Sequence, residues 1–442
     1  MKSISIYIHI PFCVKKCQYC DFLSAPADSR AQEVYLRALK QEIREQAARY
    51  REYEVQTVFI GGGTPTAGPC GKLCEVLKTV FSFYRMNPHA EISMEANPGT
   101  VTKEALLSYR KAGINRISIG LQSADDAELK LLGRIHTYRD FQQTYRWAQE
   151  AGFTNINLDI MSALPGQSVE NYKKTLETVL SLKPQHISAY SLIVEEGTPF
   201  YEKYGQESEK LQATGEKQPD LPSEEEEREM YALTEKLLAA AGYHRYEISN
   251  YALPGRECRH NLVYWKRGNY VGFGLGAASM VENVRFENIR EMQEYLAEYA
   301  GMPDAEPVFA EVAQGDAQVL SNEQEFSLRE DTHSENEQEL SLREDTHSEN
   351  EQELSIRENV HPLSPQEQME ETMFLGLRLT EGVSKAEFHR QFGVSMEQIY
   401  GEVIRKNTAK GLLIDEAGYV CLTREGMDLS NYVMAQFLLD EV

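Results

Sequence analysis

The first 200 residues alternate short β-prone apolar runs with longer amphipathic stretches, and this alternation constrains the fold of the chain most strongly. The runs that fit strands are residues 5–8, 57–60, 91–94, 116–119, 155–160 and 186–192. The stretches that fit helices include residues 33–50, 72–83, 103–111 and 171–182. Strands that alternate with helices of this length form a parallel sheet through right-handed crossovers. Six such units predict an α/β fold, a partial (β/α)6 barrel rather than a closed eight-fold one.

Chemically useful side chains follow these strands at the same end. In parallel α/β folds, the loops after the carboxyl ends of the strands form the active-site face. Each of the six predicted strands contributes to that face: in chain order Cys13, Cys17 and Cys20, then the run Gly61-Gly62-Gly63-Thr64-Pro65, Glu95, Gln122, Asp159 and Tyr190. The sequence therefore predicts one shared functional face.

The three cysteines have the spacing C-x3-C-x2-C, with no fourth cysteine nearby. Thiolates are soft ligands that suit zinc or iron–sulfur clusters. A structural zinc site needs four protein ligands, and the candidates for the fourth are His9, Cys70, Cys74 and Cys258. Three ligands on one loop also fit a four-iron, four-sulfur cluster with one iron left open.

The Gly61–Gly63 run and Glu95 each have an ordinary interpretation as well as a functional one. Glycines without Cβ atoms allow a backbone to approach a ligand and expose its N–H groups, although such a run can also be a simple turn. Glu95 can be a solvated carboxylate at a strand end. Their place beside the cysteines favours the functional interpretation of both.

Bulk properties limit the function classes. The 442 residues carry a net charge of −24, which opposes non-specific binding to nucleic acid. No apolar run approaches the length of a membrane span. The first residues read as a strand rather than as a signal peptide. Peripheral contact is therefore the one kind of membrane association that these features leave open. Seven cysteines, three of them clustered, favour a reducing compartment, and we expect a cytoplasmic protein.

The chain divides into four expected regions. Residues 1–205 form the barrel, and residues 206–300 extend it with added strands and a helix at 287–299. Residues 301–364 form an acidic low-complexity insertion, and residues 365–442 form a small winged-helix-like domain. In the extension, the run Glu224–Glu227 is expected to end a surface loop before a helix at 228–241.

The insertion carries three copies of a 14-residue unit, which start at Glu323, Glu337 and Glu351. The eight residues that open each copy include only two apolar side chains, so the unit cannot bury a core, and we expect disorder or an interaction element. In the C-terminal region we expect helices at 367–379, 385–392 and 396–410, then a β-hairpin at 411–422.

The loop Tyr7-Ile-His-Ile-Pro-Phe-Cys13-Val-Lys-Lys-Cys17-Gln-Tyr-Cys20 resembles the radical S-adenosylmethionine (SAM) superfamily. The resemblance implies a [4Fe-4S] cluster whose metal ligands are Cys13, Cys17 and Cys20 and whose open iron chelates SAM. It also implies the SAM-binding residues: Tyr7, Tyr19, Gly62, Gly63, Thr64, Glu95, Gln122, Arg134 and Asp159.

The order of the motifs resembles two sister families, oxygen-independent coproporphyrinogen III oxidases and the HemW-type heme chaperones. The resemblance covers about residues 4–300 and 367–440. The oxidases carry a cysteine where this chain has Phe22, and they have a longer N-terminal extension. The run His260-Asn-Leu-Val-Tyr264-Trp265 looks like the chaperones' H-N-x-x-Y-W signature, which makes His260 a candidate heme ligand. The alternative for His260 is a packed, hydrogen-bonded histidine.

The resemblance to the chaperones implies heme as cargo, heme-accepting partner proteins, and an electron donor if SAM is cleaved. The alternative is porphyrinogen decarboxylation through a 5′-deoxyadenosyl radical, so the enzyme status stays open. One departure bears on SAM: related chains read Tyr-Gly where this chain has Ser162-Ala163. That change affects the floor of the SAM pocket and puts SAM turnover in question.

Overall fold

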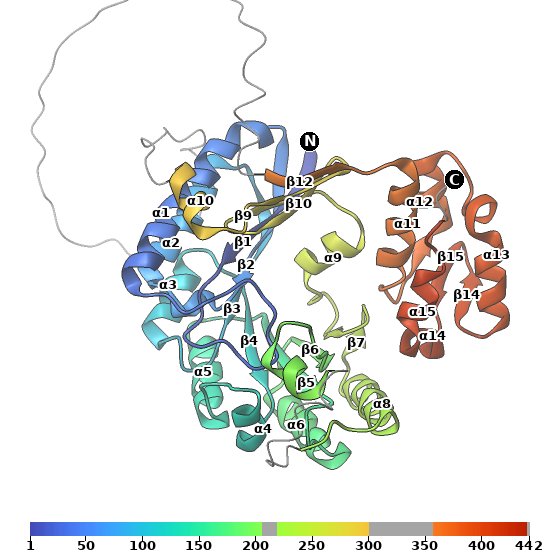
Figure 1. Ribbon diagram of the computed structural model, residues 1–442, viewed down its shortest axis with the longest axis horizontal. Coiled ribbons are helices and arrows are strands. Elements are labelled where there is room, and N and C mark those ends of the chain that lie inside the picture. The colour runs from blue at the N-terminus through green and yellow to red at the C-terminus, as the bar shows by residue number, and fades with distance from the viewer. Residues whose placement is uncertain (206–218, 300–356, 440–442) are drawn as a thin grey trace, which may run out of the picture.

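A computed structural model describes residues 1–205, 219–299 and 357–439 of the chain. Its centre is a sheet whose first six strands run parallel, side by side in chain order (Figure 1). These strands are β1 Lys2–Ile10, β2 Tyr53–Gly62, β3 Met86–Ala96, β4 Arg116–Gln122, β5 Ile156–Ser162 and β6 His186–Ser191. All six predicted strands are confirmed, within a few residues at each end.

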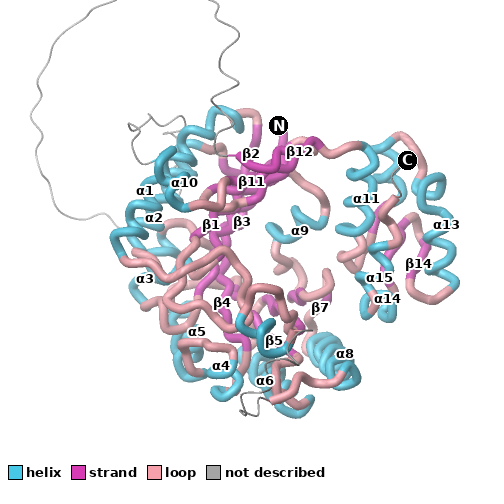
Figure 2. The backbone as a smooth tube through the Cα atoms, in the orientation of Figure 1, coloured by secondary structure: helices cyan, strands magenta, loops and turns pink. Residues whose placement is uncertain are grey.

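Helices connect these strands and cover one face of the sheet (Figure 2). They are α1 Ser29–Gln46, α2 Cys70–Phe83, α3 Lys103–Lys111, α4 Asp126–Leu131, α5 Tyr138–Glu150 and α6 Val169–Leu182. The apolar side chains of β1, Ile4, Ile6 and Ile8, pack into the main core with Leu36 and Leu39 of α1. The alternate positions of the strands carry polar side chains, which line the inside of the barrel.

Further strands extend the sheet at both edges, as the sequence predicted for the barrel extension. Beside β1 lies the parallel strand β9, followed by three antiparallel strands. Beside β6 lie β8 and then β7, both antiparallel to their neighbours. These edge strands are β7 His244–Arg245, β8 Asn250–Ala252, β9 Tyr270–Phe273, β10 Ala278–Val281, β11 Val284–Asn288 and β12 Arg357–Pro362. The twelve strands form an open sheet, which is the predicted partial barrel.

Three details differ from the sequence-based expectations. Glu224–Glu227 form the first turn of α8 Glu224–Ala240, because Ser223 caps that helix and acidic side chains suit its positive end. The expected helix at 287–299 is shorter, α10 Met292–Tyr299, since Glu287 belongs to β11. The end of the third repeat pairs with β11 as strand β12, whereas residues 301–356 of the insertion lie outside the described residues.

The C-terminal region has its own core, built around Phe388, Tyr400 and Phe437. Its elements are α11 Pro365–Gly376, β13 Val383–Ser384, α12 Lys385–Phe392, α13 Met396–Ala409, β14 Leu413–Glu416, β15 Tyr419–Leu422, α14 Arg424–Asp428 and α15 Ser430–Ala435. The predicted helices and hairpin are confirmed, while the two short final helices were not expected. None of the helices that the structure describes is long and apolar enough to cross a membrane.

Candidate functional site

The cysteine loop leaves the end of β1 and returns to it before α1 begins. Its base is closed by a bridge between Phe12 and Ala25, with Cys13 N donating to Ala25 O at 3.2 Å. All three cysteines of the loop are half-buried and unpaired. Burial raises the pKa of the Cys20 thiol to about 11, and the nearby thiols of Cys17 and Cys13 add to the shift. The three thiols therefore gather on one closed loop.

The middle of the cysteine loop rests on the segments that follow β4 and β6. Gln18 N donates to Leu132 O at 3.0 Å, and Phe200 N donates to Gln18 O at 2.9 Å. Tyr19 packs into a small apolar cluster with Leu132 and Phe200. Burial is also the main reason why the pKa of Tyr19 is raised. Tyr19 is thus part of the site, mainly as the side chain that anchors the loop.

The glycine run needs its glycines because it packs against the end of β1. Gly62 has a φ of +110°, and a Cβ there would lie 2.5 Å from the His9 ring. A Cβ on Gly63 would lie 2.6 Å from Phe12 O. The expectation of exposed N–H groups is not met here, since Gly63 N donates to Ile10 O at 2.8 Å and Thr64 N to Phe12 O at 2.7 Å. The run continues the parallel pairing of β2 with β1, which uses those donors.

A chain of polar contacts crosses the barrel mouth from Cys13 to Cys17. Thr64 Oγ1 lies 3.6 Å from Cys13 Sγ and accepts a hydrogen bond from Asn97 Nδ2 at 2.7 Å. Arg134 Nη2 donates to Asn97 Oδ1 at 2.5 Å, and Arg134 Nη1 lies 3.7 Å from Cys17 Sγ. The sequence predicted Thr64 and Arg134 but missed Asn97. Its position two residues after Glu95, at the end of β3, was the available signal.

Gln122 also belongs to this mouth. It is buried and has a left-handed backbone, with a φ of +69°. A Cβ on Gly120 would lie within 3.1 Å of the side chains of Asn97, Gln122 and Arg134. Gly120 therefore leaves the space in which those three side chains meet.

Two carboxylates point into the barrel below the mouth. Burial raises the pKa of Glu95 from 4.5 to about 8, and the Asp159 carboxylate adds to the rise, while the Gly62 N–H opposes it. Asp159 accepts hydrogen bonds from Ser118 Oγ at 3.0 Å and Asn157 Nδ2 at 2.8 Å, and burial raises its pKa too. Oxygen acceptors in this position can bind an amine or a hydroxyl group of a ligand.

Tyr7 lies beside this pair and is held by His9. The hydroxyl of Tyr7 lies 3.0 Å from His9 Nδ1, and His9 Nε2 lies 2.9 Å from Leu23 O. Because a carbonyl only accepts, Nε2 carries the proton and Nδ1 accepts from Tyr7. Both nitrogens of His9 are therefore engaged, which leaves none for the zinc alternative.

The loop after β5 contains the departure at Ser162 and Ala163. Ala163 is buried and has a φ of +57°, a conformation in which glycine is favoured. Ser162 Oγ donates to Tyr190 O at 3.3 Å. The structure thus explains why a glycine would suit position 163.

His260 lies in α9 Arg259–Trp265, and this helix is anchored to the inside of the barrel. The Glu91 carboxylate accepts from the backbone N–H groups of Arg259 and His260 at 3.0 and 3.2 Å. His260 is 1% exposed, with Nδ1 2.7 Å from Thr57 Oγ1 and Nε2 2.8 Å from Tyr264 OH. Burial lowers its pKa to about 3. In this conformation His260 matches the packed-histidine alternative.

The other end of α9 contacts the C-terminal domain, and Figure 1 shows α9 between that domain and the barrel. The Arg378 guanidinium lies 4.3 Å from the centre of the Trp265 ring. Glu371 of α11 accepts from Arg267 Nε at 2.9 Å and from Arg285 Nε at 2.8 Å. The segment around His260 therefore links the barrel interior to the C-terminal domain.

Within the described ranges, no three His, Cys, Asp or Glu side chains stand together as the ligands of a single metal ion. Cys258 is buried beside Glu91 at the start of α9, and Cys70 and Cys74 lie on α2, so none of these joins the cysteine loop. In an iron–sulfur cluster each thiolate binds a different iron, so its ligands stand further apart than those of one ion. The donor set of three unpaired thiols on one closed loop fits such a cluster.

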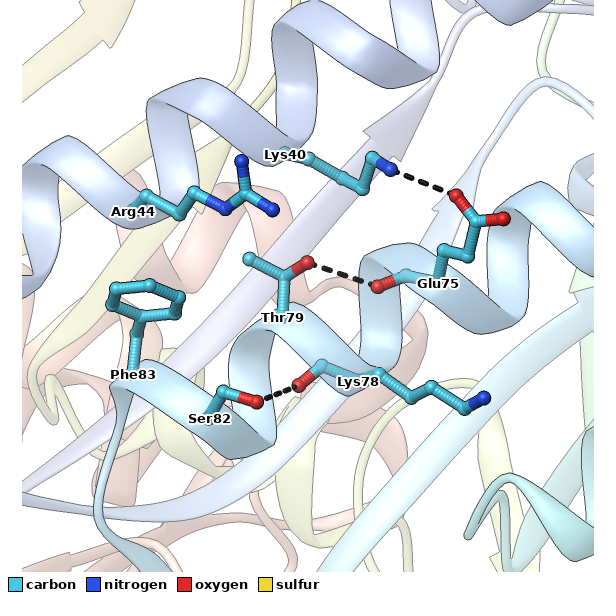
Figure 3. A pocket seen from close by; sticks show the side chains of 7 residues that line it. All are labelled: Lys40, Arg44, Glu75, Lys78, Thr79, Ser82 and Phe83. Atoms are coloured by element: carbon cyan, nitrogen blue, oxygen red, sulfur yellow. Dashed lines mark hydrogen bonds and ion pairs between the residues drawn. The ribbon is translucent and has the colours of Figure 1, made fainter. Parts of the chain in front are cut away.

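A cavity of about 280 Å³ lies between α1 and α2, on the outer helix layer and away from the barrel mouth (Figure 3). Its Lys40 Nζ is paired with Glu75 at 2.8 Å. The hydroxyls of Thr79 and Ser82 donate to carbonyls of α2 itself, at 2.9 Å each. This cavity is not part of the candidate site.

Comparison with known proteins gives two family matches. The Radical SAM superfamily model matches residues 7–179, and the HemN C-terminal domain model matches residues 363–429. The heme chaperone HemW of Bacillus subtilis is 35% identical over 435 residues, which cover 98% of this chain and 99% of that protein. The heme chaperone HemW of Lactococcus lactis is 32% identical over 444 residues, covering 100% and 99%.

Among solved structures, the radical SAM enzyme coproporphyrinogen III oxidase HemN of Escherichia coli is similar to this chain. The TM-score is 0.75 at 20% identity, and the match covers 99% of this chain and 90% of the HemN chain. At this identity the likeness shows a shared fold.

Proposed function

This chain belongs to the HemW heme chaperone family of the radical SAM superfamily, and we propose that it binds a [4Fe-4S] cluster, SAM and heme and passes heme to acceptor proteins. The observation that carries the proposal is the convergence of three unpaired cysteines with Thr64, Arg134 and Glu95 at one barrel mouth. Unpaired cysteines and a cluster also fit a reducing compartment, which supports a place in the cytoplasm.

Cys13, Cys17 and Cys20 would hold the cluster, which supplies one-electron chemistry and an open iron when it is bound. The thiols must lose their protons before they ligate iron, so cluster assembly is coupled to deprotonation. Burial raises the pKa of the Cys20 thiol to about 11, so Cys20 must lose a tightly held proton. The guanidinium of Arg134 lies 3.7 Å from Cys17 Sγ and can donate a hydrogen bond to that sulfur.

SAM would occupy the mouth between the cysteine loop and the two carboxylates. Glu95 and Asp159 can accept from the amine and hydroxyl groups of such a ligand. A positive charge close to Glu95 would favour its ionised form, whereas in the free protein burial favours the neutral form. Gln122 and Arg134, which meet above Gly120, can contact the remaining polar groups.

Heme as cargo requires a surface that can receive a flat, apolar ring with two carboxylates. The α9 segment is the proposed part of that surface, since it carries Tyr264 and Trp265 and lies at the boundary with the C-terminal domain. His260 can ligate heme iron only after it separates from Thr57 or Tyr264. Heme binding through His260 would therefore involve either a movement of α9 away from Thr57 or a rotation of the Tyr264 side chain.

The test begins with anaerobic reconstitution of the cluster in the full chain, followed by titration with heme. We expect about four irons per chain and a saturable heme absorption band. Cys17→Ala should lose the iron–sulfur absorption, whereas Cys70→Ala, a cysteine on α2 away from the loop, should keep it. Retention of the full iron content in Cys17→Ala would show that the ligand assignment is wrong. A chain that loads iron but binds no heme would refute the chaperone role.

A further inference from the structure

Asn97 joins the two sides of the barrel mouth through both ends of its carboxamide. Its backbone is fixed, because its N–H donates to Thr66 Oγ1 at 3.3 Å and its C=O accepts from Thr100 Oγ1 at 2.7 Å. Its side chain spans from Thr64 to Arg134, and each of those residues touches one cysteine. The position of the amide is thus set independently of the cysteine loop.

Arg134 determines which group donates in each hydrogen bond of this series of contacts. A guanidinium only donates, so it must face the Oδ1 of Asn97, and Nδ2 must face Thr64. Since Nδ2 only donates, Thr64 Oγ1 accepts from it at 2.7 Å. The hydroxyl proton of Thr64 is then free to point toward Cys13 Sγ, 3.6 Å away.

We propose that Asn97 is a positioning residue that directs one hydrogen-bond donor at each of two cluster-ligating sulfurs, the Thr64 hydroxyl at Cys13 and the Arg134 guanidinium at Cys17. The inference rests on the proposed cluster function. Donors to the sulfurs of an iron–sulfur cluster stabilise its more reduced, more negative state and so raise its reduction potential. Asn97 would act on the cluster without touching it.

Asn97→Asp is the sharpest variant because it keeps the size of the side chain and its partner Arg134. A carboxylate cannot donate to Thr64, so the Thr64 hydroxyl would turn to donate to the introduced carboxylate and leave Cys13. We expect a reduction potential lower than that of the unmodified chain, and an altered electron paramagnetic resonance spectrum of the reduced cluster.

The negative charge that Asn97→Asp adds also lowers a reduction potential by itself. Two comparisons separate this effect of charge from the loss of the Thr64 hydrogen bond to Cys13. Asn171→Asp makes the same charge change in the first turn of α6, on the outer helix layer, and should shift the potential less. In a Thr64→Val background the hydroxyl is absent, so Asn97→Asp should shift the potential less than it does in the unmodified chain. Equal shifts in both backgrounds, or a shift no larger than that of Asn171→Asp, would overturn the proposal.

The Thr64 variants decide the outcome if Asn97→Asp does not load a cluster. Thr64→Ser keeps the hydroxyl and should keep the potential, whereas Thr64→Val should lower it; equal potentials in these two variants would refute the role of the Thr64 donor. The unmodified chain separates this inference from the proposed function. If it binds no cluster the proposed function fails, and if it binds one while all variants share its potential only the inference about Asn97 fails.

Discussion

Ala163 stands in a left-handed backbone conformation that costs an alanine about 1–2 kcal/mol relative to the right-handed region. The loop after β5 therefore holds Ala163 in a conformation that a glycine adopts without this cost. Ala163 therefore stores a small strain directly after the end of β5.

Ala163→Gly should stabilise the chain by about 0.5–1 kcal/mol, because relief of the strained φ exceeds the extra chain entropy of glycine. Ala148→Gly, in the buried face of α5, should instead destabilise it by about 1 kcal/mol. Urea unfolding of both variants measures the change in the free energy of unfolding, which should have opposite signs. A destabilised Ala163→Gly would mean that Ala163 makes packing contacts worth more than its strain.

Glu95 gives a prediction about pH. Its pKa is raised from 4.5 to about 8, so between these pH values Glu95 holds its proton in the folded state but not in the unfolded state. The folded state therefore loses stability as the pH rises through that window. Glu95→Gln removes this loss, so its stability advantage should grow from about pH 5 to about pH 8 and then level off. Unfolding measured in the absence of SAM tests this. If the stability advantage of Glu95→Gln were the same at about pH 5 and about pH 8, the raised pKa of Glu95 would not be the cause of the pH dependence.

At the scale of secondary-structure elements, α9 and α11 decide how the C-terminal domain meets the barrel. Glu371 of α11 pairs with two arginines, and the Arg267 side chain is only 3% exposed. By contrast, the nearby pair of Lys266 and Glu381 is more than half exposed. Buried pairs lose far more than exposed pairs when one partner is removed.

Glu371→Ala should cost about 3–5 kcal/mol at the domain boundary, because it leaves the buried Arg267 guanidinium without a counter-charge. The matched change Glu381→Ala should cost no more than about 1 kcal/mol. Limited proteolysis and thermal unfolding of the full chain compare them. We expect early release of the C-terminal domain in Glu371→Ala alone, and equal behaviour of the two variants would show that the Glu371 pairs do not hold the domain.

The elements of the barrel could be predicted from sequence because each strand and helix has a strong local pattern. The apolar alternation of β1 and the capping residues of the helices act within a few positions of the chain. Glu224–Glu227 were assigned to a loop because four acidic residues read as a solvated run, whereas the Ser223 cap starts a helix there. In that case the local signal for a helix was present in the sequence but was misinterpreted, and no distant contact overrode it.

Contacts between distant elements could not be predicted in the same way. The contacts of His260 depend on Thr57 of β2, 203 residues earlier in the chain. The role of Asn97 depends on where Thr64 and Arg134 place their side chains. Sequence motifs identified which residues lie at the barrel mouth, whereas their hydrogen-bond partners required the fold.

At the scale of the whole molecule, the chain combines a radical SAM barrel and a C-terminal domain with an acidic segment between β11 and β12. Between 321 and 359 the sequence has 13 acidic and 3 basic residues, so this segment supplies much of the net charge of −24. The strands on either side of it pair directly with each other, since Asn288 aligns with Arg357.

Replacement of residues 301–356 by a flexible glycine–serine linker should leave cluster and heme binding unchanged. Within the replaced segment each repeat carries only two apolar side chains, too few to contribute a core to the sheet. Iron content and heme titration of the shortened chain measure this, with the full chain as the control. Loss of heme binding with intact iron content would instead assign the repeats to heme capture.

We propose that this chain carries heme rather than producing porphyrin, as the sequence resemblance that includes Phe22 implies. The most direct measurement uses one anaerobic, cluster-loaded sample, supplied with a reductant and SAM, and follows both bound heme and the conversion of coproporphyrinogen III. We predict saturable heme binding with no protoporphyrinogen formed. Sustained conversion to protoporphyrinogen would contradict the account.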